Sequence, residues 1–343
     1  MQTLLNTLYV STPYSYLHLD NDTIRVEVER ETRLRVPLHH LGGVVLFGNV
    51  LVSPPLIHRL ADEGKSLVLL SEHGRFKARM EGPISGNILL RQAQHARAAD
   101  AAFTLAMARA CVAGKIKNAR QVLLRGGREA RDGDDGASLA RRADDLAAAL
   151  RALPAASTLD TVRGLEGEAA RQYFAGLNRV LRADARAVFA MDGRSRRPPR
   201  DRMNALLSFL YAMLMNDCRS AVEAVGLDPQ LGFLHAVRPG RAALALDLME
   251  EFRPLADRLA LTLVNRAQLQ RGDFVEHDGG AVSLGDTGRK TVIVAWQEKK
   301  REELAHPLLQ QAVAIGLLPL LQARFLARTL RGEMESYLPF ISR

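Results

Sequence analysis

Four side chains in this sequence are of the types that bind a hard divalent cation: Glu166, His235, Asp247 and Glu250. Asp247 and Glu250 lie three positions apart in a segment with helical periodicity, which places both carboxylates on one face. Carboxylate oxygens and an imidazole suit Mg²⁺ or Mn²⁺. An ion held by Glu166, His235 and Glu250 would polarise a phosphoryl oxygen. Asp247 would orient this cluster or receive a proton, so the four residues together point to metal-dependent phosphodiester chemistry.

The surroundings of Glu166 are unusual for a helix. In the stretch GLEGEAARQYF (164–174), Gly164 and Gly167 flank the acid at the edge of an apolar stripe. Each glycine inside a helix costs about 1 kcal/mol relative to alanine. The pair therefore indicates that something bulky approaches the backbone there, either a ligand beside Glu166 or a second helix packed into a groove of small residues.

Each of these residues also has a structural explanation when it is taken singly. A histidine at the end of an apolar run can be a hydrogen-bonded core residue, and a pair of acids on a helix can be a solvated face. The combination of three carboxylates with a histidine in a strongly cationic chain is what favours the metal hypothesis.

Arginine accounts for most of the positive charge. The chain has a formal net charge of +9 and a pI near 9.9, and residues 179–202 contain eight arginines against three aspartates. A planar guanidinium suits phosphate oxygens, so a polyanionic partner such as double-stranded DNA is expected. An alternative is a solubilising loop in a chain whose genome favours arginine. The candidate phosphate-binding residues are Arg194, Arg196, Arg197, Arg200, Arg238 and Arg241.

The elements that must position these residues change in character along the chain. Short runs between residues 8 and 81, several of them alternating apolar and polar, predict strands of a small β-sandwich, whose one expected helix is SPPLIHRLADEG (53–64), capped by Ser53. Beyond residue 87 the period becomes 3.6, which predicts helices. The expected helical segments are 88–113, 137–152, 158–190, 202–226, 243–271 and 303–331.

The resulting fold class is α+β, with a small N-terminal β-sandwich domain at 1–85 and a larger, mainly α-helical catalytic domain at 86–343. A polar, glycine-rich stretch at 126–138 predicts a surface loop. The stretch 279–296 predicts one hairpin inserted between helices.

Composition excludes several classes of protein. The sequence has no run of 18 uncharged apolar residues and no secretory signal, so we expect a cytoplasmic protein without a membrane role. Its two cysteines, Cys111 and Cys218, have no CxxC partner, which argues against a disulfide framework and a thiolate zinc site and favours buried free thiols.

Four blocks in this order resemble the CRISPR-associated integrase family, Cas1, over nearly the full length of the chain. They are the strand-rich first 80 residues, GLEGEAARQYF (164–174), DRMNALLSFLYAML (201–214) and LGFLHAVRPGRAALALDLMEEFRP (231–254). The details are most similar to members from type I-C systems. The resemblance implies a homodimer, built through the N-terminal domain, that associates with the small partner Cas2.

The resemblance also implies an activity and its residues. Members of the family insert short foreign DNA fragments, called spacers, into the CRISPR array, which is how an antiviral defence acquires memory. Glu166, His235 and Glu250 match the metal ligands of the family, and Asp247 matches a neighbouring acid needed for activity. Some relatives have aspartate at the position of Glu250, so the ligand here is one methylene longer.

The expected function is therefore a metal-dependent DNA endonuclease and integrase, in which a 3′ hydroxyl attacks a phosphodiester of the repeat. Two alternatives stay open at this point. One is a standalone metal-dependent nuclease acting on branched or single-stranded DNA. The other is a non-catalytic DNA-binding scaffold.

Overall fold

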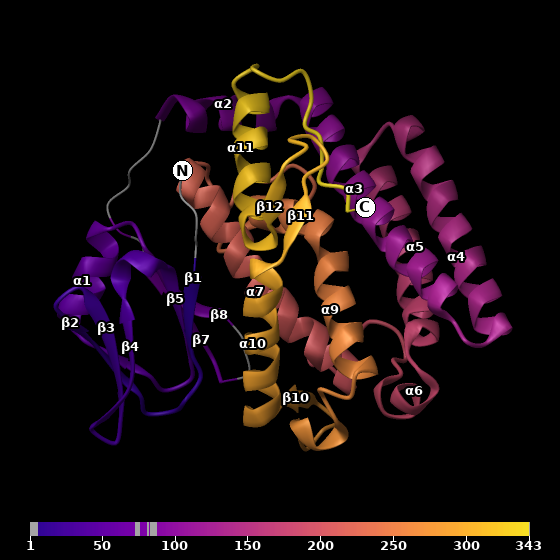
Figure 1. Cartoon of the computed structure of the whole chain (residues 1–343). Helices are drawn as coiled ribbons and strands as arrows, with labels where there is room; N and C mark the ends of the chain where they lie inside the picture. Colours follow the sequence, from indigo (N-terminus) through magenta and orange to yellow (C-terminus); the bar gives the residue numbers. More distant parts are fainter. Residues whose placement is uncertain (1–5, 73–75, 81, 83–87, 343) are drawn as a thin grey trace. The chain divides into compact units, whose positions relative to one another are not determined.

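The computed structural model describes residues 6–72, 76–80, 82 and 88–342 (Figure 1). The chain separates into two compact units. The first comprises residues 1–85 together with 284–298, and the second comprises 86–283 together with 299–343. The predicted α+β class, with strands before helices, is confirmed.

The first unit contains two four-stranded sheets. One has the order β1-β5-β7-β8, with parallel pairs β1–β5 and β5–β7 and an antiparallel pair β7–β8. Its strands are β1 (Asn6–Val10), β5 (Leu41–Phe47), β7 (Ser66–Leu70) and β8 (Phe76–Met80). The other has the order β4-β3-β2-β6. Its strands are β2 (Tyr16–Asp20), β3 (Thr23–Val28), β4 (Glu31–Pro37) and β6 (Leu51–Val52). Strand β6 has only two residues, too few to give a periodic pattern in the sequence.

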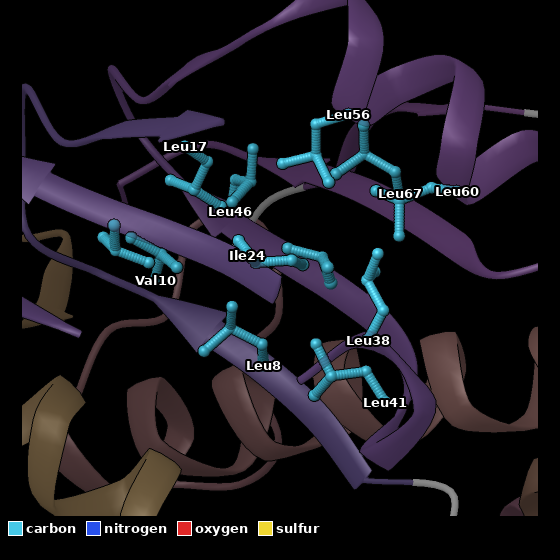
Figure 2. Close-up of a cluster of buried hydrophobic side chains, with 12 residues drawn as sticks. Leu8, Val10, Leu17, Ile24, Leu38, Leu41, Leu46, Leu56, Leu60 and Leu67 are labelled. Carbon is cyan, nitrogen blue, oxygen red and sulfur yellow. The ribbon is translucent and has the colours of Figure 1, made fainter. Parts of the chain in front are cut away.

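One apolar core joins these sheets (Figure 2). Alternate residues of a strand point to the same face, so Ile24 and Val26 of β3 both enter the core, where Leu17 of β2 lies opposite Val26 in the register. Strand β5 contributes Leu46 from the other sheet. Because both sheets supply the same core, the predicted β-sandwich is confirmed.

The predicted helix of this unit is α1 (Pro54–Asp62). The hydroxyl of Ser53 accepts a hydrogen bond from the Leu56 backbone N–H, and the prolines occupy the first turn, as the sequence indicated. Leu56 and Leu60 point from α1 into the core shown in Figure 2.

The second unit is mainly helical. Its longest helices are α3, α4, α5 and α7, and helix α3 packs against both α4 and α5 while α7 packs against α8, α9 and α11. The α-helices of this part of the chain are α2 (Ile88–Ala99), α3 (Ala101–Glu129), α4 (Gly133–Ala152), α5 (Leu159–Val180), α6 (Ala183–Phe189), α7 (Arg202–Val225), α8 (Ala243–Met249), α9 (Arg253–Asn265) and α11 (Leu318–Leu330). The short 3-10 helix η3 (Glu250–Phe252) joins α8 to α9. The other 3-10 helices of the chain are η1 (Leu38–His40), η2 (Leu153–Ala155), η4 (Arg271–Asp273) and η5 (Ile315–Leu317).

Three predictions of local structure are wrong. The hairpin expected at 279–296 is confined to β9 (Phe274–Glu276) and β10 (Val282–Leu284), and helix α10 (Asp286–Arg301) follows it. The loop expected at 126–138 is largely helical, because α3 continues to Glu129 and Asp132 caps α4 through the Asp134 backbone N–H. The helix expected at 303–331 begins only at Leu318, after the hairpin of β11 (Glu303–Ala305) and β12 (Ala312–Ala314).

Two expectations from composition can be compared with the structure. Cys111 and Cys218 are buried free thiols, as predicted. Within the described ranges, none of the helices combines the length and the apolar character needed to cross a membrane.

Candidate functional site

Helix α5 carries Glu166 at the boundary between its buried and exposed faces. Val162, Ala169 and Tyr173 are buried, whereas the Glu166 side chain is 26% exposed. A Cβ atom built on Gly164 or Gly167 would meet no described atom within 4 Å. Helix packing therefore does not account for these glycines, and the helix surface beside Glu166 is open.

The segment that carries His235 is held in place by three side chains from other elements. Gln94 of α2 donates to the carbonyls of Asp228 and Leu231, at 2.9 Å each. Arg163 of α5 donates twice to the carbonyl of Leu234, at 3.1 and 2.7 Å. The third anchor is the carboxylate of Asp247.

Asp247 accepts four hydrogen bonds from this segment. Its Oδ2 accepts from the backbone N–H groups of Phe233 and Leu234, at 2.5 and 3.0 Å. Its Oδ1 accepts from the backbone N–H of His235 at 3.0 Å and lies 2.7 Å from His235 Nδ1. A Cβ atom at Gly232 would lie 2.7 Å from Asp247 Oδ2, so only glycine allows this close approach. Both oxygens of Asp247 are thus occupied, and the side chain orients His235.

This arrangement determines which nitrogen of His235 is free. A carboxylate beside Nδ1 favours the tautomer with the proton on Nδ1, which leaves a lone pair on Nε2. Nε2 lies 3.8 Å from Oε1 of Glu250. His235 is therefore prepared to act as a ligand through Nε2, with its ring orientation set by Asp247.

Glu250 begins η3 and is buried among cations. Arg253 Nε donates to its Oε1 at 2.9 Å, and the Lys115 ammonium of α3 lies 2.7 Å from its Oε2. Burial alone would raise the pKa of Glu250, but Arg253, Lys115 and His235 outweigh it and hold the pKa at about 2. Glu250 is therefore ionised at neutral pH despite its burial.

Lys115 also joins Glu250 to Glu166, because its ammonium donates to Glu166 Oε1. The four residues expected to form a site thus meet at one place: Glu166 and Glu250 share the Lys115 ammonium, His235 faces Glu250, and Asp247 holds His235. Among the described residues, no three such side chains stand in metal-ligand geometry. Instead, a positive charge of the chain lies between the two carboxylates.

The candidate phosphate-binding arginines divide into two groups. Arg196, Arg197, Arg200 and Arg238 are exposed, and Arg241 is half-buried. Arg194 forms the second group, because its guanidinium donates to Ser195 O and Asn204 Oδ1 at 2.6 Å each and lies over the Tyr211 ring. These contacts engage the Arg194 guanidinium within the protein, and its contact with phosphate stays a prediction.

Sequence reasoning missed Lys115 and Arg253. Lys115 lies beyond the predicted end of its helix at residue 113, so its face could not be assigned. Arg253 follows Glu250 by three positions, and that spacing on a helix was a usable signal for an ion pair.

A second buried acid, Asp257, belongs to the network around Arg253. Asp257 of α9 accepts hydrogen bonds from the hydroxyls of Tyr173 and Tyr211, at 2.9 and 2.6 Å. The Arg253 guanidinium lies 4.7 Å from the centre of the Tyr211 ring. Burial raises the pKa of Asp257 to about 6, although the two tyrosine hydroxyls lower it. This network links α5, α7 and α9 next to Glu250.

The raised pKa of Asp257 predicts a pH dependence of stability. Its stabilising contribution is fully present below the unfolded pKa of 3.8 and is lost as the pH rises through about 6. Relative to Asp257→Asn, the wild type should therefore lose about 2 kcal/mol of unfolding free energy between pH 4.5 and 7. Urea unfolding at both pH values measures this, with Asp278→Asn, at an exposed position, as the control. A difference that does not change with pH would contradict the assignment.

Comparison with family models and with curated proteins points to one family. The family described as CRISPR associated protein Cas1 matches residues 8–298. The CRISPR-associated endonuclease Cas1 1 of Moorella thermoacetica is 56% identical over 344 residues, which is 100% of both chains. The CRISPR-associated endonuclease Cas1 2 of Rhodospirillum rubrum is 50% identical over 345 residues and 99% of both chains.

Solved structures show the same fold. A Cas1 protein from Thermotoga maritima superposes with a TM-score of 0.81 at 23% identity, covering 95% of this chain and 97% of that one. A casposase bound to an integration product gives a TM-score of 0.83 at 20% identity, covering 97% of this chain and 92% of that one. With a family match over most of its length and relatives that share half or more of its residues, this chain belongs to the Cas1 family of CRISPR-associated proteins.

Proposed function

We propose that this protein is a metal-dependent DNA endonuclease and integrase that inserts short foreign DNA fragments into a CRISPR array. The observation that carries the proposal is the grouping of three side chains of metal-ligand type. Glu166 and Glu250 Oε2 share the Lys115 ammonium, and His235 Nε2 lies 3.8 Å from the other oxygen of Glu250, Oε1. The names of its relatives, which are endonucleases, support the same activity. The assignment to type I-C rests on the sequence blocks and is part of this proposal.

The donor types present suit a hard divalent cation, although no three of them among the described residues stand in metal-ligand geometry with Lys115 between the carboxylates. Two carboxylates and the Nε2 lone pair of a histidine are a donor set for Mg²⁺ or Mn²⁺, and the Lys115 ammonium stands in for a cation between the carboxylates. The chemistry that such an ion supplies when bound is the stabilisation of negative charge on the oxygens of the attacked phosphate. Glu166, His235 and Glu250 would hold it.

The remaining residues of the site bind and orient. Asp247 holds the His235 ring with the Nε2 lone pair directed at the site, so it acts as a positioning residue. Arg238 and Arg241 bind backbone phosphates of double-stranded DNA. The 3′ hydroxyl oxygen of the incoming fragment forms a bond to phosphorus as the bond from phosphorus to the 3′ oxygen of the repeat breaks. The attacking hydroxyl loses its proton, and the departing 3′ oxygen takes one up to become a hydroxyl. One phosphodiester replaces another, and no external energy source is needed.

Two copies of the chain would act together. We propose that residues 1–85 form the dimerisation domain and residues 86–343 the catalytic domain, and that the homodimer assembles with Cas2. A two-fold axis then supplies one site for each end of the fragment. Complexes of Cas1 with Cas2 are known for a protein with the same fold.

A strand-transfer assay tests the proposed function. The protein and its Cas2 partner are incubated with Mg²⁺ or Mn²⁺, a repeat-containing duplex and a fragment with either a free or a blocked 3′ end. Joining is expected only with the free 3′ hydroxyl, and EDTA should stop it. Hydrolysis that survives the 3′ block, without joining, would instead indicate a standalone nuclease. DNA binding that is unchanged by EDTA, without any cleavage or joining, would indicate a scaffold.

The exposed arginines make a prediction about salt. If Arg196, Arg197 and Arg200 each contact a phosphate, replacing all three with glutamine should weaken DNA binding. It should also reduce the slope of log affinity against log salt concentration by about 2.7, at about 0.9 per phosphate. Fluorescence anisotropy with labelled duplex at several salt concentrations measures both effects.

A matched control removes the same charge elsewhere. Arg131, Arg141 and Arg151 are exposed on or next to α4, and their replacement with glutamine lowers the net charge equally. We expect the slope of this variant to stay within about one phosphate equivalent of the wild type. Equal slopes for the two triple variants would show that the 196–200 loop has no special part in binding DNA.

A further inference from the structure

Lys115 lies where the two carboxylates of the site come together. Its ammonium contacts Glu166 Oε1 on one side and lies 2.7 Å from Glu250 Oε2 on the other, and its side chain is 13% exposed. Glu250 Oε2 is buried and accepts no hydrogen bond of good geometry among the described residues. Its contact with a positive charge is the ion pair with the Lys115 ammonium. The position between the carboxylates is therefore occupied by the protein itself.

The other cation at Glu250 is held differently. Arg253 is buried, donates to Glu250 Oε1 and lies over the Tyr211 ring, whose hydroxyl is bound by Asp257. A planar guanidinium fixed on a ring and a carboxylate is rigid. Lys115 in contrast has a flexible stem and a compact, readily hydrated ammonium, so it is the cation that can leave.

The backbone that carries Lys115 is fixed against the site. Asn118, three positions further on α3, donates to the carbonyls of Glu251 and Phe340 at 2.8 and 2.9 Å. Gly114 lies so close to the C-terminal segment that a Cβ there would meet Pro339 Cβ at 2.8 Å. A displacement of the ammonium must therefore be a movement of the side chain and not of the helix.

We propose that Lys115 is a tethered cation that fills the metal position of the metal-free protein and that a divalent ion enters by displacing it. The residue thereby lowers the affinity of the site for metal and keeps Glu166 and Glu250 neutralised until the ion arrives. This inference rests on the proposed metal dependence. It assigns Lys115 a role in setting metal affinity, which is separate from the role of the ligands.

The first test measures Mn²⁺ affinity by electron paramagnetic resonance on the full chain. Lys115→Met keeps an unbranched stem and removes the charge. Lys117→Met removes an equal charge from an exposed position on the same helix and is the control. We expect Lys115→Met to bind Mn²⁺ about tenfold or more tightly than the wild type, and Lys117→Met to match the wild type. A folded Lys115→Met with unchanged or weaker affinity would overturn the inference.

A second measurement uses the wild type and so does not depend on the variant folding. Amine acetylation followed by mass spectrometry reports the reactivity of each lysine with and without Mn²⁺, in the absence of DNA. Displacement predicts that Mn²⁺ raises the labelling rate of Lys115 about tenfold, towards that of an exposed lysine, and leaves Lys117 unchanged. Equal labelling of Lys115 in both conditions would also overturn the inference.

The outcomes separate this inference from the proposed function. If the wild type binds Mn²⁺ at a site that Glu166→Gln removes, but Lys115→Met binds no more tightly, only the role of Lys115 fails. If neither the wild type nor Lys115→Met binds Mn²⁺, and strand joining persists in EDTA, both the inference and the metal-dependent function fail.

Discussion

Glu166→Gln should lower the rate of metal-dependent strand joining by about a thousandfold. Glutamine has almost the same shape but no charge, so the site would lose one of its two carboxylate ligands at the open edge of α5. A metal centre contributes several kcal/mol of transition-state stabilisation, and about 1.4 kcal/mol corresponds to a factor of ten in rate. Single-turnover kinetics with a 3′-hydroxyl fragment, at saturating Mg²⁺, measures the loss.

Glu168 provides the matched control for this experiment. It lies two positions further on α5, its side chain is 52% exposed, and it pairs with Arg171 on the surface. Glu168→Gln removes the same charge from the same helix, so its rate should stay within about twofold of the wild type. If Glu166→Gln and Glu168→Gln reacted equally fast, Glu166 would have no part in the chemistry.

Asp247→Asn should reduce both stability and activity. An asparagine oxygen can replace only one of the two carboxylate oxygens, so its NH₂ group would face two N–H donors of the 233–235 segment. A buried polar group left without a partner costs about 1–3 kcal/mol, and we expect a loss of about 3 kcal/mol in the free energy of unfolding. Because the His235 tautomer is no longer selected, the joining rate should fall about a hundredfold.

Three measurements examine this second prediction. Urea unfolding gives the stability, the strand-joining assay gives the rate, and nitrogen NMR of labelled histidine gives the tautomer of His235. Asp192→Asn, at an exposed position, is expected to change none of them. A normal rate in Asp247→Asn, with the His235 tautomer unchanged, would show that Asp247 does not position the ring.

Much of the architecture follows from local pattern. Several strands of the first unit, such as β3, alternate apolar and polar residues, and the helix at 54–62 has a serine cap with prolines in its first turn, so these elements could be assigned from neighbours in sequence. The error at 279–296 has a physical cause. The β-branched run TVIV favours a strand, but in the structure it lies in α10, where Val292 and Ile293 are buried. Tertiary burial overrode local propensity.

The residues of the site also fall into two groups: those that the sequence pattern indicates, and those whose role depends on contacts far away along the chain. The types and spacing of His235, Asp247 and Glu250 were sufficient to group them, and the glycines beside Glu166 marked that acid as a further candidate. Lys115 could not be found in this way, because its importance comes from two contacts, 51 and 135 positions away along the chain. The contacts of Arg194 with Asn204 and Tyr211 were likewise not indicated by the sequence.

Anomalous diffraction from crystals of the protein soaked in Mn²⁺ tests the central claim most directly. The account predicts one strong peak within bonding distance of a carboxylate oxygen of Glu166, Nε2 of His235 and a carboxylate oxygen of Glu250, with the Lys115 ammonium moved away. A fully soaked crystal with no peak among these three side chains, or with the peak bound elsewhere, would contradict it.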